Sequence, residues 1–332
     1  MGKLVEYLKI FRAHTSPVTV LTLVVYYYLA GGEIWSATTL AIVLLGIYLH
    51  WCGFGHNSVM DYHYDINDPH KKHFPLVRGT IKYEEAKAVI NWMMMLGALV
   101  VVAFTLFVAE NKILALASLV LYIQMGHSYN DGLDKVTIWK WVPEALCYMF
   151  LASWAYFLAS KDISTIYWLS MLYMFLVIMY EIYWEGELKE IKFGDEVNIL
   201  RHFGSRVEDD ILYIPKWLQA TSYLINIAKL IIGALIIHLT SSLAGLIIFA
   251  VGAVIVMHYV RKMTKSPRIY DHDKELEYMG NAEAFGLLFF TLGIMAKDAT
   301  TFAFGLVMFA FSLGWYLLFN KIQWGVAKRP QV

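Results

Sequence analysis

Apolar runs long enough to cross a lipid bilayer recur along the whole chain, and this feature limits what it can fold into. A helix needs about 20 mostly apolar residues to cross roughly 30 Å of hydrocarbon. We interpret ten runs as spans, several of which must extend into their polar flanks: residues 17–31, 37–52, 88–108, 113–125, 141–158, 166–183, 218–239, 243–260, 284–296 and 302–319. The pattern predicts an all-α, polytopic transmembrane helix bundle of nine or ten spans.

The composition agrees with a membrane protein. Hydrophobic residues make up 59% of the 332 residues and charged residues only 16%, against about 25% in soluble domains. The formal net charge is +0, so bulk electrostatics indicates no nucleic-acid partner. No Gly/Ser-rich linker or low-complexity tract divides the sequence, and we therefore interpret residues 1–332 as a single domain.

The charges in the connections predict the topology. The connections after the first, third, fifth, seventh and ninth runs are tiny and carry as cations only Lys112, Lys161 and Lys297. The connections after the second, fourth, sixth and eighth runs are mostly long and rich in lysine and arginine. The positive-inside rule places this second set in the cytoplasm. We therefore expect an integral membrane protein whose two termini and acidic loops are all cytoplasmic.

A first acidic motif follows the second apolar run. Asn57, Asp61 and Asp65 are spaced four residues apart, which stacks them on one face of a helix. Neighbouring carboxylates repel each other, and a divalent cation removes that penalty. Mg²⁺ prefers a few carboxylates together with water and substrate phosphates. The motif indicates a Mg²⁺ site at the membrane surface; the alternative is a solvated helix end with ordinary surface acids.

A second acidic motif ends the sixth run, at the corresponding place in the other half of the chain. Glu181 and Glu185 share one helix face, and Glu187 and Glu190 share another. Two acidic clusters at the same membrane face could together hold several divalent cations. The alternative is again a charged helix end that merely solvates.

The first motif and the residues after it resemble the UbiA superfamily of intramembrane prenyltransferases. The family signature is Asn-Asp-x-x-Asp-x-x-x-Asp, a basic linker, Arg-Pro-Leu, Gly-x-Ile and Glu-Ala. Over residues 57–86 the chain has Asn57, Asp61 and Asp65 in register, then Phe-Pro-Leu at 74–76, Gly-Thr-Ile at 79–81 and Glu-Ala at 85–86. It departs from the signature at two positions, where Ser58 replaces the first Asp and Phe74 replaces the usual Arg.

The resemblance implies a second metal motif at the end of the sixth run. Trp-Glu-Gly-Glu at 184–187 resembles the family's Ile-Glu-Gly-Asp, with a small insertion in the alignment. Tyr183 stands where the family has its other Asp, so the resemblance implies Glu187 as a ligand, with Glu181 or Glu190 supplying the second carboxylate. The predicted catalytic residues are Asp61, Asp65 and Glu187, and the predicted metal ligands are Asn57, Asp61, Asp65, Glu181, Glu185, Glu187 and Glu190.

Cationic and polar residues near the two motifs complete the predicted site. The loop after the fourth run occupies the place of the family's Tyr-Ser…Leu-Lys segment, so Tyr129 and Asp131 are candidates for the acceptor or tail pocket, against the alternative of a surface turn. Lys229 lies well inside an apolar run, and it is either a third such candidate or a lysine that snorkels to the interface. The candidate diphosphate partners are Lys72, His73, Arg78, Lys135, Lys140 and Arg201.

Together the motifs and the resemblance imply Mg²⁺-dependent transfer of a prenyl group from an isoprenyl diphosphate to a hydrophobic or aromatic acceptor within the lipid bilayer. One alternative is a terpene cyclase or diphosphate lyase on the same fold, which shares the metal site and lacks an acceptor pocket. A second alternative is a membrane transporter, in which acids are expected near the midplane. In this chain the acids cluster at one end of the spans.

Overall fold

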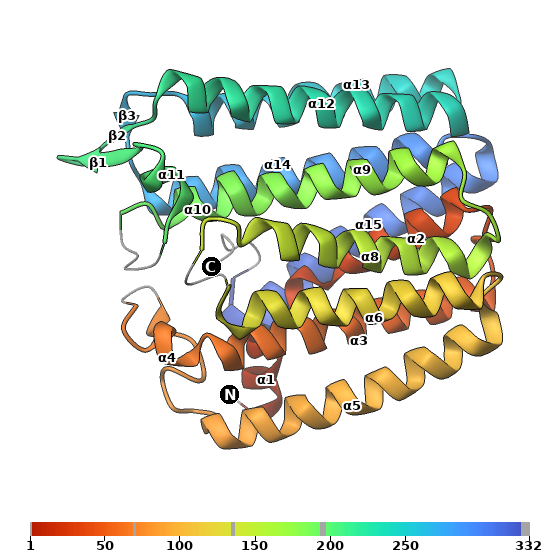
Figure 1. The fold of residues 1–332 in the computed structure, drawn as a ribbon, viewed down its shortest axis with the longest axis horizontal. Helices are drawn as coiled ribbons and strands as arrows, with labels where there is room; N and C mark the ends of the chain where they lie inside the picture. The colour runs from red at the N-terminus through yellow and green to blue at the C-terminus, as the bar shows by residue number, and fades with distance from the viewer. Residues whose placement is uncertain (1, 69–70, 134–136, 193–196, 327–332) are drawn as a thin grey trace.

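The computed structural model describes residues 2–68, 71–133, 137–192 and 197–326, and the predicted diphosphate partner Lys135 lies outside them. Within these residues the chain forms a bundle of long helices that run side by side (Figure 1). Each of the ten apolar runs lies wholly or mostly within one long helix. These helices are α2 (Ser16–Leu29), α3 (Ala37–Met60), α5 (Tyr83–Val108), α6 (Lys112–Ser128), α8 (Trp141–Ala159), α9 (Thr165–Tyr180), α12 (Lys216–Thr240), α13 (Leu243–Thr264), α14 (His272–Met295) and α15 (Ala299–Trp324).

Within the described residues, seven helices are long and apolar enough to cross a membrane. They are α3, α5, α8, α12, α13, α15 and the helical stretch Thr165–Lys189 that begins with α9. Of the other three long helices, α2 and α6 have 14 and 17 residues, and α14 carries charged side chains in its first turn. Apolar side chains such as Phe107 and Val254 point outward, 88% and 71% exposed, which suits a surface that faces lipid.

The tight turns at one end of the bundle are held by helix caps. Five helices begin at this end, and in each the residue before the first helical residue accepts a hydrogen bond from a backbone N–H of the first turn. Such caps satisfy orphan donors and contribute about 1 kcal/mol each. The capping residues are Ser36, Asn111, Ser164, Ser242 and Asp298.

The opposite end of the bundle carries the chain's first helix and the short polar elements (Figure 1). The N-terminal segment packs against the last helix there, since Gln323 Nε2 donates to the Leu8 carbonyl at 2.9 Å. Contacts between the two ends of the described chain therefore help to hold this polar end together. The short helical elements are α1 (Lys3–Ile10), η1 (Ala13–Thr15), α4 (Tyr62–Asp65), η3 (Tyr129–Leu133), η4 (Glu181–Gly186), α10 (Glu187–Lys189) and α11 (Ile199–His202).

A small antiparallel sheet at the polar end departs from the all-α prediction. The strand β2 (Ile211–Tyr213) pairs with β1 (Arg206–Glu208) on one side and with β3 (Arg268–Ile269) on the other. The turn between β1 and β2 uses Asp209 and Asp210, which both have positive φ, 49° and 60°. Two central residues with positive φ are characteristic of the type I′ hairpin turn. Strands of two or three residues are too short to leave an alternating pattern in the sequence.

Close packing of α13 on α14 depends on a glycine, and this gives a stability prediction. A Cβ at Gly252 would lie 2.3 Å from the Cβ of Phe289. We expect Gly252→Ala to lower the free energy of unfolding by about 1–3 kcal/mol, because the added methyl forces the helices apart. Thermal unfolding of both forms in one detergent measures the change.

Gly314→Ala is the matched control for this prediction. Gly314 lies on α15, where an added Cβ would meet nothing within 4 Å. Replacing a helical glycine without a clash stabilises a helix by up to about 1 kcal/mol. Opposite signs for the two variants are the expected outcome, and equal melting shifts would contradict the close-packing argument.

Candidate functional site

A cavity of about 710 Å³ lies between the long helices and reaches the polar end of the bundle. Its wall includes side chains from both acidic motifs, which are far apart in the sequence. The first motif contributes Asn57, Asp61 and Asp65, and the second contributes Glu181, Glu187 and Glu190. The structure thus brings the two predicted motifs to one cavity.

The first motif keeps its helical spacing although α3 ends just before Asp61. The Asp61 N–H donates to the Asn57 carbonyl at 2.9 Å, and the Asp65 N–H donates to the Asp61 carbonyl at 2.9 Å. The three side chains therefore stay on one side of the backbone. Asp65 lies 3.8 Å from Lys71 Nζ, and Asn57 Nδ2 donates to Asn130 Oδ1 at 3.2 Å. The motif is held by polar contacts at the cavity wall.

At the second motif, directly after α9, the helix continues as a wider π-helical turn, η4. Such turns are rare and frequently lie at functional sites. Glu185 faces a smaller inner pocket, Glu187 and Glu190 face the large cavity, and Glu181 lines both. Glu181 and Glu185, which were predicted to share a helix face, therefore both line the inner pocket. Glu187 and Glu190, the other predicted pair, both line the large cavity.

Protein groups bind both carboxylate oxygens of Glu187. Lys140 Nζ lies 2.6 Å from Oε1, and the backbone N–H of Ile199 donates to Oε2 at 2.6 Å. Glu187 is 2% exposed and Lys140 is 6% exposed. Loss of one partner in such a buried pair leaves an uncompensated charge. The geometry therefore favours Glu187 as an anchor that holds Lys140 at the cavity wall.

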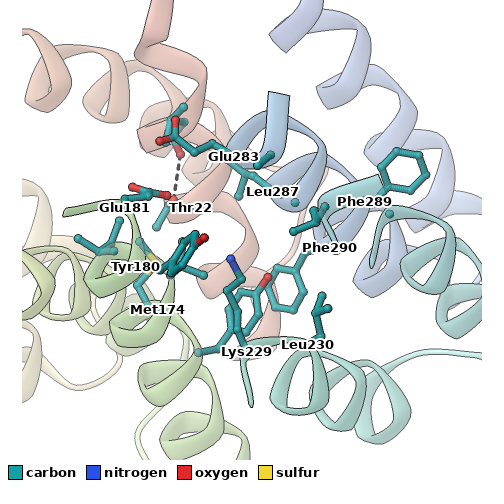
Figure 2. Close-up of a pocket in the computed structure, with 18 of the residues that line it drawn as sticks. Thr22, Met174, Tyr180, Glu181, Lys229, Leu230, Glu283, Leu287, Phe289 and Phe290 are labelled. Atoms are coloured by element: carbon teal, nitrogen blue, oxygen red, sulfur yellow. Dashed lines mark hydrogen bonds between the residues drawn. The ribbon is translucent and has the colours of Figure 1, made fainter. Parts of the chain in front are cut away.

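The inner pocket, about 80 Å³, contains a cluster of ionisable side chains between α9, α12, α13 and α14. Figure 2 shows the amino group of Lys229 pointing toward Tyr180, with the carboxylates of Glu181 and Glu283 beyond it. Lys229 Nζ lies 5.1 Å from the centre of the Tyr180 ring. Glu185 also lines this pocket, and its buried Oε2 has no hydrogen-bond partner among the described residues. Ionisable residues inside membrane helices are costly and mark functional sites.

Four of the predicted diphosphate partners are not part of the cavity wall. Lys72 and Arg78 are exposed, and Arg78 Nη2 donates to the Glu6 carboxylate at 2.8 Å. That contact lies outside the membrane spans. Burial tends to raise the pKa of Glu6, but Lys9, Thr80 and Arg78 together hold it below its usual value. His73 and Arg201 do not line the cavity either. Of the predicted diphosphate partners within the described residues, the cavity wall includes Lys140 alone.

Cations outside the predicted set line the cavity instead. Arg12, Lys71 and Lys189 belong to its wall, and the predicted partner Lys140 joins them. The buried Nε of Arg12 has no hydrogen-bond partner within the described residues. An unsatisfied buried donor at a cavity wall suits an anionic ligand. The sequence carried little signal for Arg12, because it lies in the N-terminal segment far from both motifs.

The deeper wall of the cavity is apolar. Tyr129, a predicted pocket residue, lines the cavity together with Tyr148, whereas Asp131 is exposed and is not part of the wall. Farther from the polar end the lining comes from the middle parts of α3, α5, α6 and α8. Its aliphatic members include Leu49, Val101, Leu119 and Leu151. The cavity therefore combines a charged mouth with an apolar interior.

The fold of this chain is similar to solved structures. An apo UbiA homologue from Aeropyrum pernix K1 has a TM-score of 0.63 at 14% identity, covering 84% of this chain and 96% of that chain. A digeranylgeranylglyceryl phosphate synthase has a TM-score of 0.62 at 18% identity, covering 89% and 99%. A UbiA homologue from Archaeoglobus fulgidus solved with GPP and Mg²⁺ has a TM-score of 0.59 at 14% identity, covering 87% and 99%.

Sequence comparison gives the family. A search of curated protein sequences found no match. The model of the UbiA prenyltransferase family matches residues 18–275, a range that contains both acidic motifs and most of the cavity wall. The match covers well over half of the 332 residues. The chain therefore belongs to the UbiA prenyltransferase family.

Proposed function

We propose that this chain transfers a prenyl group from an isoprenyl diphosphate to a hydrophobic or aromatic acceptor, with Mg²⁺ as cofactor. One observation carries the proposal: both acidic motifs line a single cavity whose deeper wall is apolar. The charged mouth suits a diphosphate with its cations, and the apolar interior suits a prenyl chain. The Archaeoglobus fulgidus homologues solved with GPP or DMAPP and Mg²⁺ support the same assignment here.

The oxygen donors of the first motif fit Mg²⁺. Asn57, Asp61 and Asp65 offer one amide and two carboxylate groups from one side of a helical backbone. Mg²⁺ prefers oxygen ligands and retains sites for phosphate oxygens. When bound, it neutralises the diphosphate and makes it a better leaving group.

For the second motif we propose Glu181 and Glu190 as the ligands, because both line the cavity. Glu185 faces the inner pocket, so we place it outside the metal site. Glu187 is already bound on both oxygens. We propose that Glu187 acts as a positioning residue for Lys140.

The cations of the wall would hold the diphosphate. Arg12, Lys71, Lys140 and Lys189 line the cavity, and cationic donors form charge-assisted hydrogen bonds to phosphate oxygens. The carbon–oxygen bond of the donor breaks with its electron pair leaving on the diphosphate. The prenyl carbon becomes an allylic cation, which the π-faces of nearby tyrosines stabilise and the apolar wall shields from water.

The acceptor would approach from the inner pocket. Lys229 lines that pocket, and Glu181 and Glu283 line both that pocket and the large cavity. The acceptor atom forms the new bond to the prenyl carbon and releases a proton. We propose that the Glu283 carboxylate receives this proton, because it lines both spaces and is not among the proposed Mg²⁺ ligands.

We also propose that the polar end of the bundle and both termini face the cytoplasm. The tiny connections at the capped end carry few cations, whereas the long connections at the polar end are rich in them. The positive-inside rule places the cation-rich connections on the cytoplasmic side of the membrane. Accessibility labelling of a cysteine placed in the β1–β2 turn would report its side directly.

The purified protein, assayed with a panel of isoprenyl diphosphates and acceptors, tests the function. We expect mass spectrometry to detect a prenylated acceptor in Mg²⁺ and none in EDTA, with activity restored by added Mg²⁺. A cyclic or hydrolysed product from the donor without any acceptor would favour the cyclase or lyase. Absence of product together with absence of Mg²⁺-dependent donor binding would overturn the proposal.

A further inference from the structure

Two histidines and an aspartate meet at one side of the cavity. His56 comes from α3, His127 from the last turn of α6, and Asp131 from the π-helix η3. One ligand atom of each lies within 4.8 Å of those of the other two. The rings of His56 and His127 lie edge to face with their centres 4.8 Å apart. No other group of three His, Cys, Asp or Glu side chains comes this close within the described residues.

The local backbone explains why these groups converge. Asp131 follows His127 by four residues, so that one helical turn places both on the same side. The widened turn of η3 begins between them and carries the aspartate to the surface, where it is exposed. His56 reaches them from the neighbouring helix and lines the cavity with His127. Small side-chain rotations would bring the ligand atoms to the roughly 3–3.5 Å separation that bond lengths near 2.1 Å require.

Asn130 contacts one of these histidines from outside the group of three. Asn130 Nδ2 contacts His56 Nδ1 at 3.0 Å, and Asn57 Nδ2 donates to Asn130 Oδ1 at 3.2 Å. The two ends of an amide side chain can exchange places. If both amides turn over, Asn130 accepts a hydrogen bond from His56 Nδ1–H and leaves Nε2 for a ligand. Asn57 Oδ1 then accepts from Asn130 Nδ2 and keeps its second lone pair for a cation. Metal-bound histidines almost always donate their other ring N–H in this way.

We propose that His56, His127 and Asp131 bind a divalent transition-metal ion of the Fe²⁺ to Zn²⁺ group. Two imidazoles and one carboxylate form a donor set typical of these metals, whereas Mg²⁺ prefers oxygen ligands alone. The site is distinct from the oxygen-only Mg²⁺ site proposed above, and it does not depend on prenyl transfer. Its remaining coordination positions face the cavity because two of the ligands line that wall.

Cobalt binding to the intact protein, purified without a histidine tag, tests the site. The assay contains excess Mg²⁺, which fills oxygen-only sites. We expect one Co²⁺ per chain with visible d–d absorption, and we expect Zn²⁺ but not further Mg²⁺ to displace it. Zn²⁺ should also raise the melting temperature, because a ligand that binds only the folded state stabilises it.

Two ligand variants and one control decide the outcome. His127→Gln and Asp131→Asn should each weaken Co²⁺ binding by roughly 100-fold or more, since even outer-shell changes cost 10- to 100-fold. Asp131 is exposed, so its variant is expected to fold even if a histidine variant does not. His202→Gln removes an exposed histidine on α11 and should leave binding unchanged. Wild-type Co²⁺ affinity in Asp131→Asn, or equal loss in His202→Gln, would overturn the proposal.

Discussion

Asp61→Asn is expected to lower kcat/KM for the isoprenyl diphosphate by about 100- to 1,000-fold, the usual cost of removing one group that stabilises developing charge. Asp61 is the middle member of the first motif, and its backbone is bonded to both Asn57 and Asp65. The amide keeps the shape of the side chain and removes its negative charge. The variant should also need more Mg²⁺ for half-maximal activity, measured by product formation across a Mg²⁺ titration.

Asp209→Asn is the matched control for this result. It makes the same chemical change in the exposed turn between β1 and β2, where the backbone has a φ of 49°. Asparagine is well tolerated in this left-handed region. The control should keep both the rate and the Mg²⁺ requirement of the unmodified protein. An unchanged Mg²⁺ titration in Asp61→Asn would remove the first motif from the proposed metal site.

Lys140→Met is expected to lower the free energy of unfolding by about 3–5 kcal/mol, because it leaves the buried Glu187 carboxylate without its cation. The salt bridge is 2.6 Å long and both side chains are nearly inaccessible. Adding Glu187→Gln to the same chain should recover most of the loss. The glutamine oxygen can still accept the backbone N–H of Ile199, which now donates to Glu187. Unfolding titrations in mixed micelles measure the single and double variants.

Lys274→Met is the control for the buried pair. Lys274 pairs with Asp271 at 3.1 Å, but the two side chains are 62% and 39% exposed. Exposed pairs contribute about 0–1 kcal/mol, so little change is expected. If the double variant at 140 and 187 were no more stable than Lys140→Met alone, the lost stability would come from packing rather than from the unpaired charge.

The helices could be predicted from the sequence because each apolar run by itself indicates where a membrane helix lies. The run 243–260, for example, lies within α13 (Leu243–Thr264). The spacing of Asn57, Asp61 and Asp65 is equally local, and their shared side follows from it. The strand β3 could not be predicted, since it has two residues and exists only through its pairing with β2.

Features of the site that depend on distant packing were harder to predict. Arg12 lines the cavity because the N-terminal segment packs against α15 at the polar end, and no residue near Arg12 in the sequence indicates this. Glu283 faces the inner pocket from α14 and lies far from both motifs in the sequence. The pairing of Lys140 with Glu187 joins the start of α8 to the start of α10. In each case the sequence gives the chemical type of the side chain, but only the fold gives the residues that lie beside it.

The extra residue in the π-helix η4 (Glu181–Gly186) has a consequence for how the second motif can change over time. A π-helical turn closes hydrogen bonds between residues five apart and so holds about one residue more than an α-helical turn. Deleting that residue would restore an ordinary turn and leave α10 in nearly its present direction, so Glu187 would stay beside Lys140. A single codon gained or lost here thus reorients the acids within the turn without moving the partner of Lys140 or lengthening any loop.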